Sequence, residues 1–237
     1  MRIAVIADIH SNIFSLNEIL LDIDNRNVDM LICLGDLVGY ATYPNEVIDT
    51  IRENRIVTIK GNYDEAVGEE LMACGCDYPD PKDLENAWIS LNWTIDETRE
   101  DNREFLKSLP VEVIMSFEGK TLRFVHGSPR KVNEYLRENS REAEEVMADF
   151  EEDILVCGHT HKPYYKRYGD KLLVNAGSAG KPKTGMPKAN YVIIDMQGTS
   201  VNVEIYEVEY EYERTAEAIE AEGLPQEFAD IIRTGRA

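Results

Sequence analysis

The N-terminal part of the chain alternates between short apolar runs and longer stretches in which apolar residues recur every three or four positions. The short runs predict buried strands at residues 2–7, 30–34 and 55–59. The periodic stretches begin after Asn12 and at Pro44, a residue type suited to the first turn of a helix. Strand, helix, strand, helix, strand is typical of a mostly parallel α/β sheet.

The segment 62–108 replaces this alternation with helical spacing. We predict helices at 62–73 and 83–108, joined by a loop at Asp77–Pro81 whose prolines lack amide donors. A further helix is predicted at 134–150 and closing helices at 213–234. Further strands are predicted at 111–116, 121–126, 153–157, 163–168, 171–174, 190–196 and 200–208. Because no internal repeat or linker interrupts the pattern, we predict a single domain over 1–237 with a helical insertion at about 62–108.

The composition is that of an ordinary globular protein, with 43% hydrophobic and 30% charged residues. No apolar run approaches the roughly 20 residues that cross a bilayer. The apolar start at residues 2–7 is also too short for a signal peptide. We therefore expect a cytoplasmic protein without a membrane partner.

The charge balance narrows the choice of partners. The chain carries 45 acidic and 25 basic side chains, a formal charge of −20. Such a surface repels a nucleic-acid backbone, and no basic stripe offsets it, which argues against polymeric nucleic acid. A small phosphate ester or nucleotide held by a local positive charge is compatible with this balance. The sequence makes no prediction of the oligomeric state.

The four cysteines are of two kinds. Cys33 and Cys157 lie within apolar runs, as free buried thiols do. Cys74 and Cys76 have a spacing found in some metal sites, but no second cysteine or histidine pair lies near them in the sequence. We interpret them as a loop with two reduced thiols, with a metal site as the less favoured alternative.

Polar clusters follow five of the predicted strands, where ligands of open α/β sheets bind. Taken singly, Asp8 reads as a helix cap and each histidine as a hydrogen-bonded structural residue. All four histidines of the chain stand at these strand ends, however, which favours one shared site over independent coincidences. The clusters are Asp8-Ile-His10, Gly35-Asp36, Gly61-Asn62-Tyr63-Asp64, His126-Gly-Ser and Gly158-His159-Thr-His161.

The donors in these clusters favour two metal ions rather than one. They are nitrogen and oxygen atoms without a thiolate, which suits Mn²⁺ above all, and also Fe²⁺, Zn²⁺, Co²⁺ or Ni²⁺. A carboxylate such as Asp36 can bridge two ions, as in sites that hydrolyse phosphate esters by attack of a bridging hydroxide. The predicted metal ligands are Asp8, His10, Asp36, Asn62, His126, His159 and His161.

As an ordered set, these motifs resemble those of the calcineurin-like metallophosphoesterase family, over residues 8–161. The stretches 8–12, 35–40 and 175–181 are similar to those of its small prokaryotic, phosphodiesterase-like branch. The resemblance implies an α/β fold, a four-layer αββα sandwich of two mixed β-sheets. It also implies ligand roles: Asp8, His10 and His161 for one ion, Asn62, His126 and His159 for the other, and Asp36 between them.

Tyr63 departs from the family pattern, which usually has a histidine there that stabilises the transition state or protonates the leaving group. A phenol is a weaker acid at neutral pH, so that role does not transfer directly. Three interpretations stay open: a neutral hydrogen-bond donor to the phosphoryl group, a wall of the pocket, or a sign of lost activity. If the acid is missing, esters with good leaving groups should react best.

Other residues near the motifs are candidates for supporting roles. Asp64 is expected to orient a ligand or Asn62. On the substrate side, Asn12 and Tyr40 follow ligand motifs closely enough to reach the crevice, and Lys181 is a candidate to bind an anion together with Lys183.

The leading functional prediction is a dinuclear metal-dependent phosphoesterase acting on a small phosphate ester, phosphodiester or nucleotide. One alternative is a dinucleoside polyphosphate hydrolase, because relatives with a non-histidine residue at the Tyr63 position include such activities. Another is a non-catalytic metal-binding scaffold, as in a retromer subunit that resembles this fold. Retention of all seven predicted ligands favours an enzyme over the scaffold.

Overall fold

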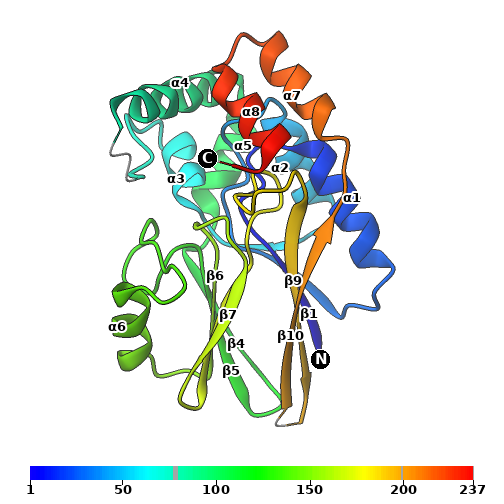
Figure 1. The fold of residues 1–237 in the computed structure, drawn as a ribbon, viewed down its shortest axis with the longest axis vertical. Coiled ribbons are helices and arrows are strands. Elements are labelled where there is room, and N and C mark those ends of the chain that lie inside the picture. The colour runs from blue at the N-terminus through cyan, green and yellow to red at the C-terminus, as the bar shows by residue number, and fades with distance from the viewer. Residues whose placement is uncertain (77–79, 199, 237) are drawn as a thin grey trace.

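Two five-stranded sheets lie face to face in the computed structural model, which describes residues 1–76, 80–198 and 200–236 (Figure 1). The order of the first sheet is β10 (Ser200–Val208), β9 (Ala189–Gln197), β1 (Arg2–Ile6), β2 (Met30–Cys33) and β3 (Val57–Thr58). Strands β1, β2 and β3 are parallel, β9 pairs with β1 in antiparallel fashion, and β10 does so with β9.

The second sheet has the same mixed character. Its order is β4 (Glu112–Phe117), β5 (Lys120–Val125), β6 (Ile154–Cys157), β8 (Lys171–Asn175) and β7 (Tyr164–Tyr168). Strands β5, β6 and β8 are parallel, and the antiparallel strands β4 and β7 form its two edges.

Helices cover the outer face of each sheet. The second sheet packs against α6 (Arg141–Asp149), through a small core that includes Ala143 and Met147. The larger outer layer lies on the first sheet and consists of α1 (Ile13–Asp24), α2 (Pro44–Glu53), α3 (Asn62–Gly68), α4 (Pro81–Glu97), α5 (Glu100–Ser108), α7 (Tyr212–Ala221) and α8 (Gln226–Thr234).

Strand β1 shows how the sequence produces these layers. Successive side chains of a strand point to opposite faces. Ile3 and Val5 therefore enter the core between the sheets, while Ala4 and Ile6 enter the core beneath the helices. Burial on both faces explains why this run is continuously apolar. Three cores between four layers confirm the predicted αββα sandwich.

Several predicted boundaries were wrong for local reasons. The helix predicted at 134–150 begins only at Arg141, because Ser140 caps it by accepting a hydrogen bond from the amide of Ala143. The helix predicted at 62–73 ends at Gly68. The segment 83–108 is two helices, since Thr98 adopts an extended conformation that ends α4.

The proline-rich loop is shorter than predicted, because Pro81 already forms the first turn of α4, whose cap is Asp80. Residues 77–79 of that loop lie outside the described part of the chain. Among the described residues, no helix combines the length and apolar character that spanning a membrane requires.

Candidate metal centre

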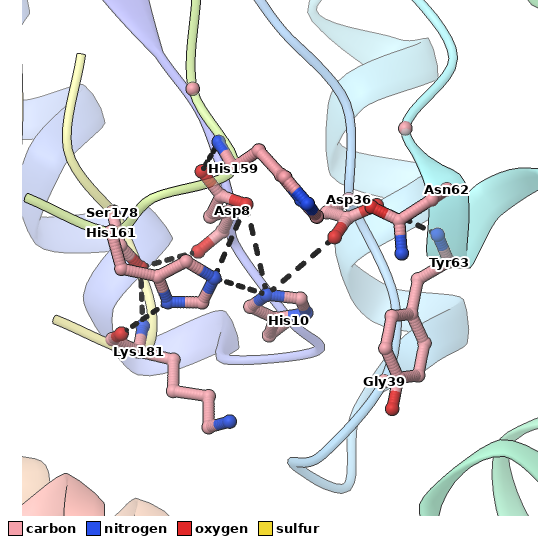
Figure 2. A network of polar contacts seen from close by, with 12 residues as sticks. Asp8, His10, Asp36, Gly39, Asn62, Tyr63, His159, His161, Ser178 and Lys181 are labelled. Carbon is pink, nitrogen blue, oxygen red and sulfur yellow. Dashed lines mark hydrogen bonds and ion pairs between the residues drawn. The ribbon is translucent and has the colours of Figure 1, made fainter. Parts of the chain in front are cut away.

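The five polar strand ends meet at one edge of the sandwich, as predicted. Asp8 and His10 follow β1, Asp36 follows β2, and Asn62 is the first residue of α3, just beyond β3. From the second sheet, His126 follows β5, and His159 and His161 follow β6. Each of these side chains is at most 5% exposed. The site thus lies between the two sheets and draws on both (Figure 2).

The backbone is strained at most of the predicted ligands. Asp8, His10, Asp36, His159 and His161 all have φ between 50° and 64°, in the left-handed region that non-glycine residues rarely adopt. Such conformations cost of order 1–3 kcal/mol each and cluster at functional sites. The sharp turns direct these side chains inwards at the ends of the strands.

A first group of donors consists of Asp8, His10 and His161. The two Nε2 atoms are 3.2 Å apart and lie 3.8 and 3.4 Å from the Oδ1 atom of Asp8 (Figure 2). Each Nδ1 contacts a backbone carbonyl: that of Val38 at 3.0 Å from His10, and that of Lys181 at 2.6 Å from His161. Because a carbonyl only accepts, each Nδ1 carries the proton and each Nε2 presents a lone pair.

A second group consists of Asp36, His126 and His159, with Asn62 beside it. His126 Nδ1 donates to the carbonyl of Leu34 at 2.8 Å, so its Nε2 is also a lone-pair donor to a cation. That Nε2 lies 3.0 Å from Asn62 Oδ1 and 3.2 Å from His159 Nδ1.

Asp36 lies between the two groups. Its Oδ2 atom is 3.8 Å from His10 Nε2 and 3.5 Å from His126 Nε2. Its Oδ1 atom accepts a hydrogen bond from the amide of Tyr63 at 2.8 Å. A Cβ atom at Gly61 would approach Oδ1 to 2.2 Å, so glycine is required for this carboxylate to reach its position.

The chemistry of these donors fits divalent cations. Lone pairs that face each other repel unless a positive charge lies among them, and Asp8 Oδ1 is buried without a hydrogen-bond partner. Burial raises the pKa of Asp8 to about 7 and holds the pKa of His10 and of His161 well below its usual range. Without a cation the site therefore disfavours the charged forms of these residues, and a metal ion supplies the missing charge.

A comparison with known families gives the site its context. A sequence model of the calcineurin-like phosphoesterase superfamily domain matches residues 1–199, which include all seven predicted ligands. The chain belongs to this superfamily. Its members are metal-dependent, and the protein is accordingly a phosphoesterase, a hydrolase acting on phosphate esters.

Relatives extend the similarity over nearly the whole phosphoesterase. An uncharacterised protein of Methanocaldococcus jannaschii, MJ0912, is 33% identical over 260 aligned positions, covering 99% of this chain and 98% of that protein. A metallophosphoesterase from Sphaerobacter thermophilus is 28% identical, with a TM-score of 0.80 and 99% coverage of both chains. The hypothetical protein PH1004 of Pyrococcus horikoshii has the same fold, with a TM-score of 0.85 at 24% identity and coverage of 100% and 99%.

A cavity of about 550 Å³ opens beside the candidate metal centre of the phosphoesterase. Tyr40 and Lys181, both predicted on the substrate side, line it, and so does Lys183. The ammonium group of Lys181 lies 3.3 Å from the centre of the Tyr40 ring, a cation–π contact. Tyr40 also packs edge-on against the ring of His10, with 5.0 Å between ring centres. The structure thus brings these residues to a space that adjoins the candidate ligands.

Asn12 does not face the cavity as predicted but lies inside the protein. It is fully buried, and its amide oxygen accepts hydrogen bonds from the amide of Ser15 and the hydroxyl of Thr215. Its amide nitrogen donates to the carbonyl of Gly180 and the hydroxyl of Tyr210. With its polar atoms engaged inside the protein, Asn12 caps α1, and the predicted substrate contact gives way to this structural role.

Asp64 holds the loops that carry the ligands. Its carboxylate accepts hydrogen bonds from the amides of Asp36 and Leu37, both at 2.8 Å, and from that of Gly61 at 2.9 Å. These contacts agree with a positioning role, since Asp64 is fully buried and reaches Asp36 only through its backbone.

Asn62 is oriented by the cysteine loop. Its amide nitrogen donates to the carbonyl of Cys74 at 3.1 Å and to the Sγ atom of Cys76 at 3.2 Å, which turns its oxygen towards His126. All four cysteines are free thiols, and Cys33 and Cys157 are buried as predicted.

Sequence reasoning missed other residues along the cavity. The ring of Tyr135 stacks on that of His159, with 4.1 Å between ring centres, and the Arg137 guanidinium lies 4.5 Å from the Tyr135 ring. Both residues fell within a stretch predicted to be helical, so they were not considered as loop residues near the site. Lys162 and Thr160 also line the cavity, and their adjacency to His159 and His161 in the sequence was an available signal.

The structure places the Tyr63 side chain behind the candidate ligands, where it neither lines the cavity nor reaches into it. Its side chain is 1% exposed, does not line the cavity, and stacks against Gly39, where a Cβ atom would approach the ring to 2.5 Å. In Figure 2 its hydroxyl points away from Asp36 and Asn62. Burial, followed by the neighbouring Tyr40, holds the pKa of Tyr63 well above its usual range. It is therefore a neutral group behind the candidate ligands.

Replacing Tyr63 with phenylalanine should change kcat by less than about fivefold, since a general acid in use contributes about 100-fold or more. Rates for aryl phosphodiesters should fall as the leaving-group pKa rises, with the same slope in both proteins. Initial rates across a series of substituted phenols would measure this. A steeper slope in the phenylalanine variant would show instead that Tyr63 donates a proton to the leaving group.

Proposed function

We propose that the phosphoesterase is a dinuclear enzyme that hydrolyses a small phosphodiester or nucleotide, with Mn²⁺ as the preferred metal. The observation that carries the proposal is the position of Asp36, whose Oδ2 atom lies within 4 Å of a ligand nitrogen from each donor group. A carboxylate in this position suits a bridge between two ions. Asp8, His10 and His161 would hold one ion, and Asn62, His126 and His159 the other.

A bound pair of ions supplies positive charge for the phosphoryl oxygens and a water of lowered pKa as the nucleophile. The chain contributes the rest. Backbone carbonyls fix the proton of His10, His126 and His161 on Nδ1, which keeps Nε2 available as a ligand. Lys181 lies where it can bind an anionic oxygen of the ester on the cavity side of His161. Burial places the ligands in surroundings of low polarity, where their interactions with charge are stronger than in bulk water.

The test is release of p-nitrophenol by metal-stripped protein, with and without added Mn²⁺, from bis(p-nitrophenyl) phosphate and p-nitrophenyl phosphate side by side. We expect release only with metal, and faster release from the diester. Metal content measured by mass spectrometry should approach two ions per chain, which checks the dinuclear assignment separately. Protein that has taken up metal yet releases nothing from either ester would contradict the proposal and favour a non-catalytic scaffold.

A further inference from the structure

Four cationic side chains line the cavity beside the metal centre: Arg137, Lys162, Lys181 and Lys183. Acidic residues outnumber basic ones by 45 to 25 in this chain, and many of its basic side chains are in ion pairs. Over residues 1–76, 80–198 and 200–236, none of these four has an acidic partner within ion-pair distance. Four positive charges without an ion-pair partner thus line one cavity of an acidic protein.

The four cations extend from the metal centre to the mouth of the cavity. Lys181 is buried, Lys183 is half-buried, and Lys162 and Arg137 are exposed. Lys162 directly follows His161, and the amide of Lys183 donates to the His161 carbonyl at 3.2 Å. Arg137 is connected to the other donor group, because its guanidinium covers the Tyr135 ring that stacks on His159. The four cations are therefore connected to both donor groups.

The remaining lining of the cavity is acidic or uncharged. Asp83 on α4 and Glu227 on α8 line it, and so does Glu138 beside Arg137, so a bound anion is directed to the lysine side. Near Asp83 and Glu227, Phe228 and Ala87 give apolar surface. Asn86 is 4% exposed and has an amide oxygen without a hydrogen-bond partner. This part of the wall suits an uncharged group with a hydrogen-bond donor.

Lys162 and Arg137 are exposed, and solvation alone would explain their charge. Solvation does not explain the positions of Lys181 and Lys183. Lys181 is buried and Lys183 is half-buried, and neither has an acidic partner within ion-pair distance among the described residues, so their charge is unfavourable until an anion approaches. One phosphate at the metal centre has Lys181 beside it. With Lys183, Lys162 and Arg137 the cavity holds four positive charges, about twice the charge of a single phosphate group.

We propose that Arg137, Lys162 and Lys183 form a subsite for a second phosphate group, so that the substrate is a compound with at least two phosphates, such as a nucleoside polyphosphate or bisphosphate. The inference rests on the proposed function, since it places the first phosphate at the metal centre. The second phosphate lies along the lysine side, and the uncharged part of the substrate faces Asn86 and Phe228.

Calorimetric titration of the Mn²⁺-loaded protein tests the subsite without depending on turnover. The ligands are AMP, the α,β-methylene analogue of ADP, and adenosine 3′,5′-bisphosphate, with Mn²⁺ in excess. The compounds share one nucleoside and differ in the number and place of their phosphates. We expect one of the two bisphosphorylated compounds to bind at least about tenfold more tightly than AMP, because charge-assisted hydrogen bonds are strong. Tighter binding of the ADP analogue would indicate a substrate with consecutive phosphates, and tighter binding of the 3′,5′-bisphosphate one with phosphates at separate positions.

Two variants and a matched control locate the effect. Arg137→Gln and Lys183→Gln should each reduce the preference for the second phosphate to about threefold or less. Lys166→Gln removes the same charge from β7, where Lys166 is half-buried, does not line the cavity and donates to Asn139 Oδ1 at 2.9 Å. It should retain the full preference. Thermal unfolding of each variant verifies that it is folded.

Equal affinity for AMP and both bisphosphorylated compounds would overturn the subsite, and so would a preference that survives in both pocket variants. Release of p-nitrophenol from bis(p-nitrophenyl) phosphate separates the two proposals. Metal-dependent release without any preference for a second phosphate would leave the phosphoesterase proposal standing and remove the subsite. A preference without release would support the subsite and contradict the proposed activity on esters.

Discussion

Substitution of Asp36 with asparagine is expected to lower the Mn²⁺-dependent hydrolysis of bis(p-nitrophenyl) phosphate by about 1000-fold, the scale of losing a central electrostatic group. Asparagine keeps the shape of the side chain and an oxygen for the Tyr63 amide, but it places a neutral amide where Oδ2 faces His10 and His126. Initial rates, together with metal content per chain, measure the effect.

The same substitution should not unfold the protein. Burial, with the Asp64 carboxylate next in importance, raises the pKa of Asp36 well above its usual value, so the charged form is unfavourable in the metal-free state. A neutral amide removes that penalty, and the metal-free variant should melt no lower than the wild type. Asp170→Asn, at an exposed position between β7 and β8, serves as the control and should keep full activity. An Asp36→Asn protein with more than a tenth of the wild-type rate would rule out a central role for this carboxylate.

Substitution of Asp64 with alanine should instead destabilise the fold, by about 3–5 kcal/mol of the free energy of unfolding. Three buried amides, those of Asp36, Leu37 and Gly61, would lose their acceptor together. Urea denaturation of the metal-free protein measures the loss.

A matched control for Asp64→Ala comes from Asp80→Ala. Asp80 also accepts a hydrogen bond from a backbone amide, that of Lys82 at 2.8 Å, but at the exposed start of α4. Its loss should cost only about 1 kcal/mol, as for other helix caps. If the two variants proved equally stable, Asp64 would not have the positioning role that its contacts indicate.

The candidate ligands could be predicted from the sequence because each follows a strand directly. Parallel strands bring their carboxyl ends to one edge, so Asp8, Asp36 and Asn62 converge without knowledge of any other contact. The layers were predictable for a similar reason, since the continuous apolar run of β1 requires burial on both faces.

What could not be predicted depends on contacts between distant parts of the chain. Asn12 carries the polar side chain that a substrate contact needs, but Thr215 and Tyr210, about 200 positions away, engage it. Tyr135 and Arg137 fall within the helix predicted at 134–150. Only the fold shows that their loop passes over His159, where a ring stack holds Tyr135 in place.

Each donor group combines residues from both sheets: Asp8 and His10 with His161, and Asp36 with His126 and His159. An ion held by such a group would act as a cross-link between two layers whose shared core is apolar. Binding of metal by the folded chain then adds to the stability of the whole sandwich, in proportion to the logarithm of the free metal concentration above its dissociation constant. The proposed catalytic centre would in this way also cross-link the two sheets, and a shortage of metal would weaken both functions together.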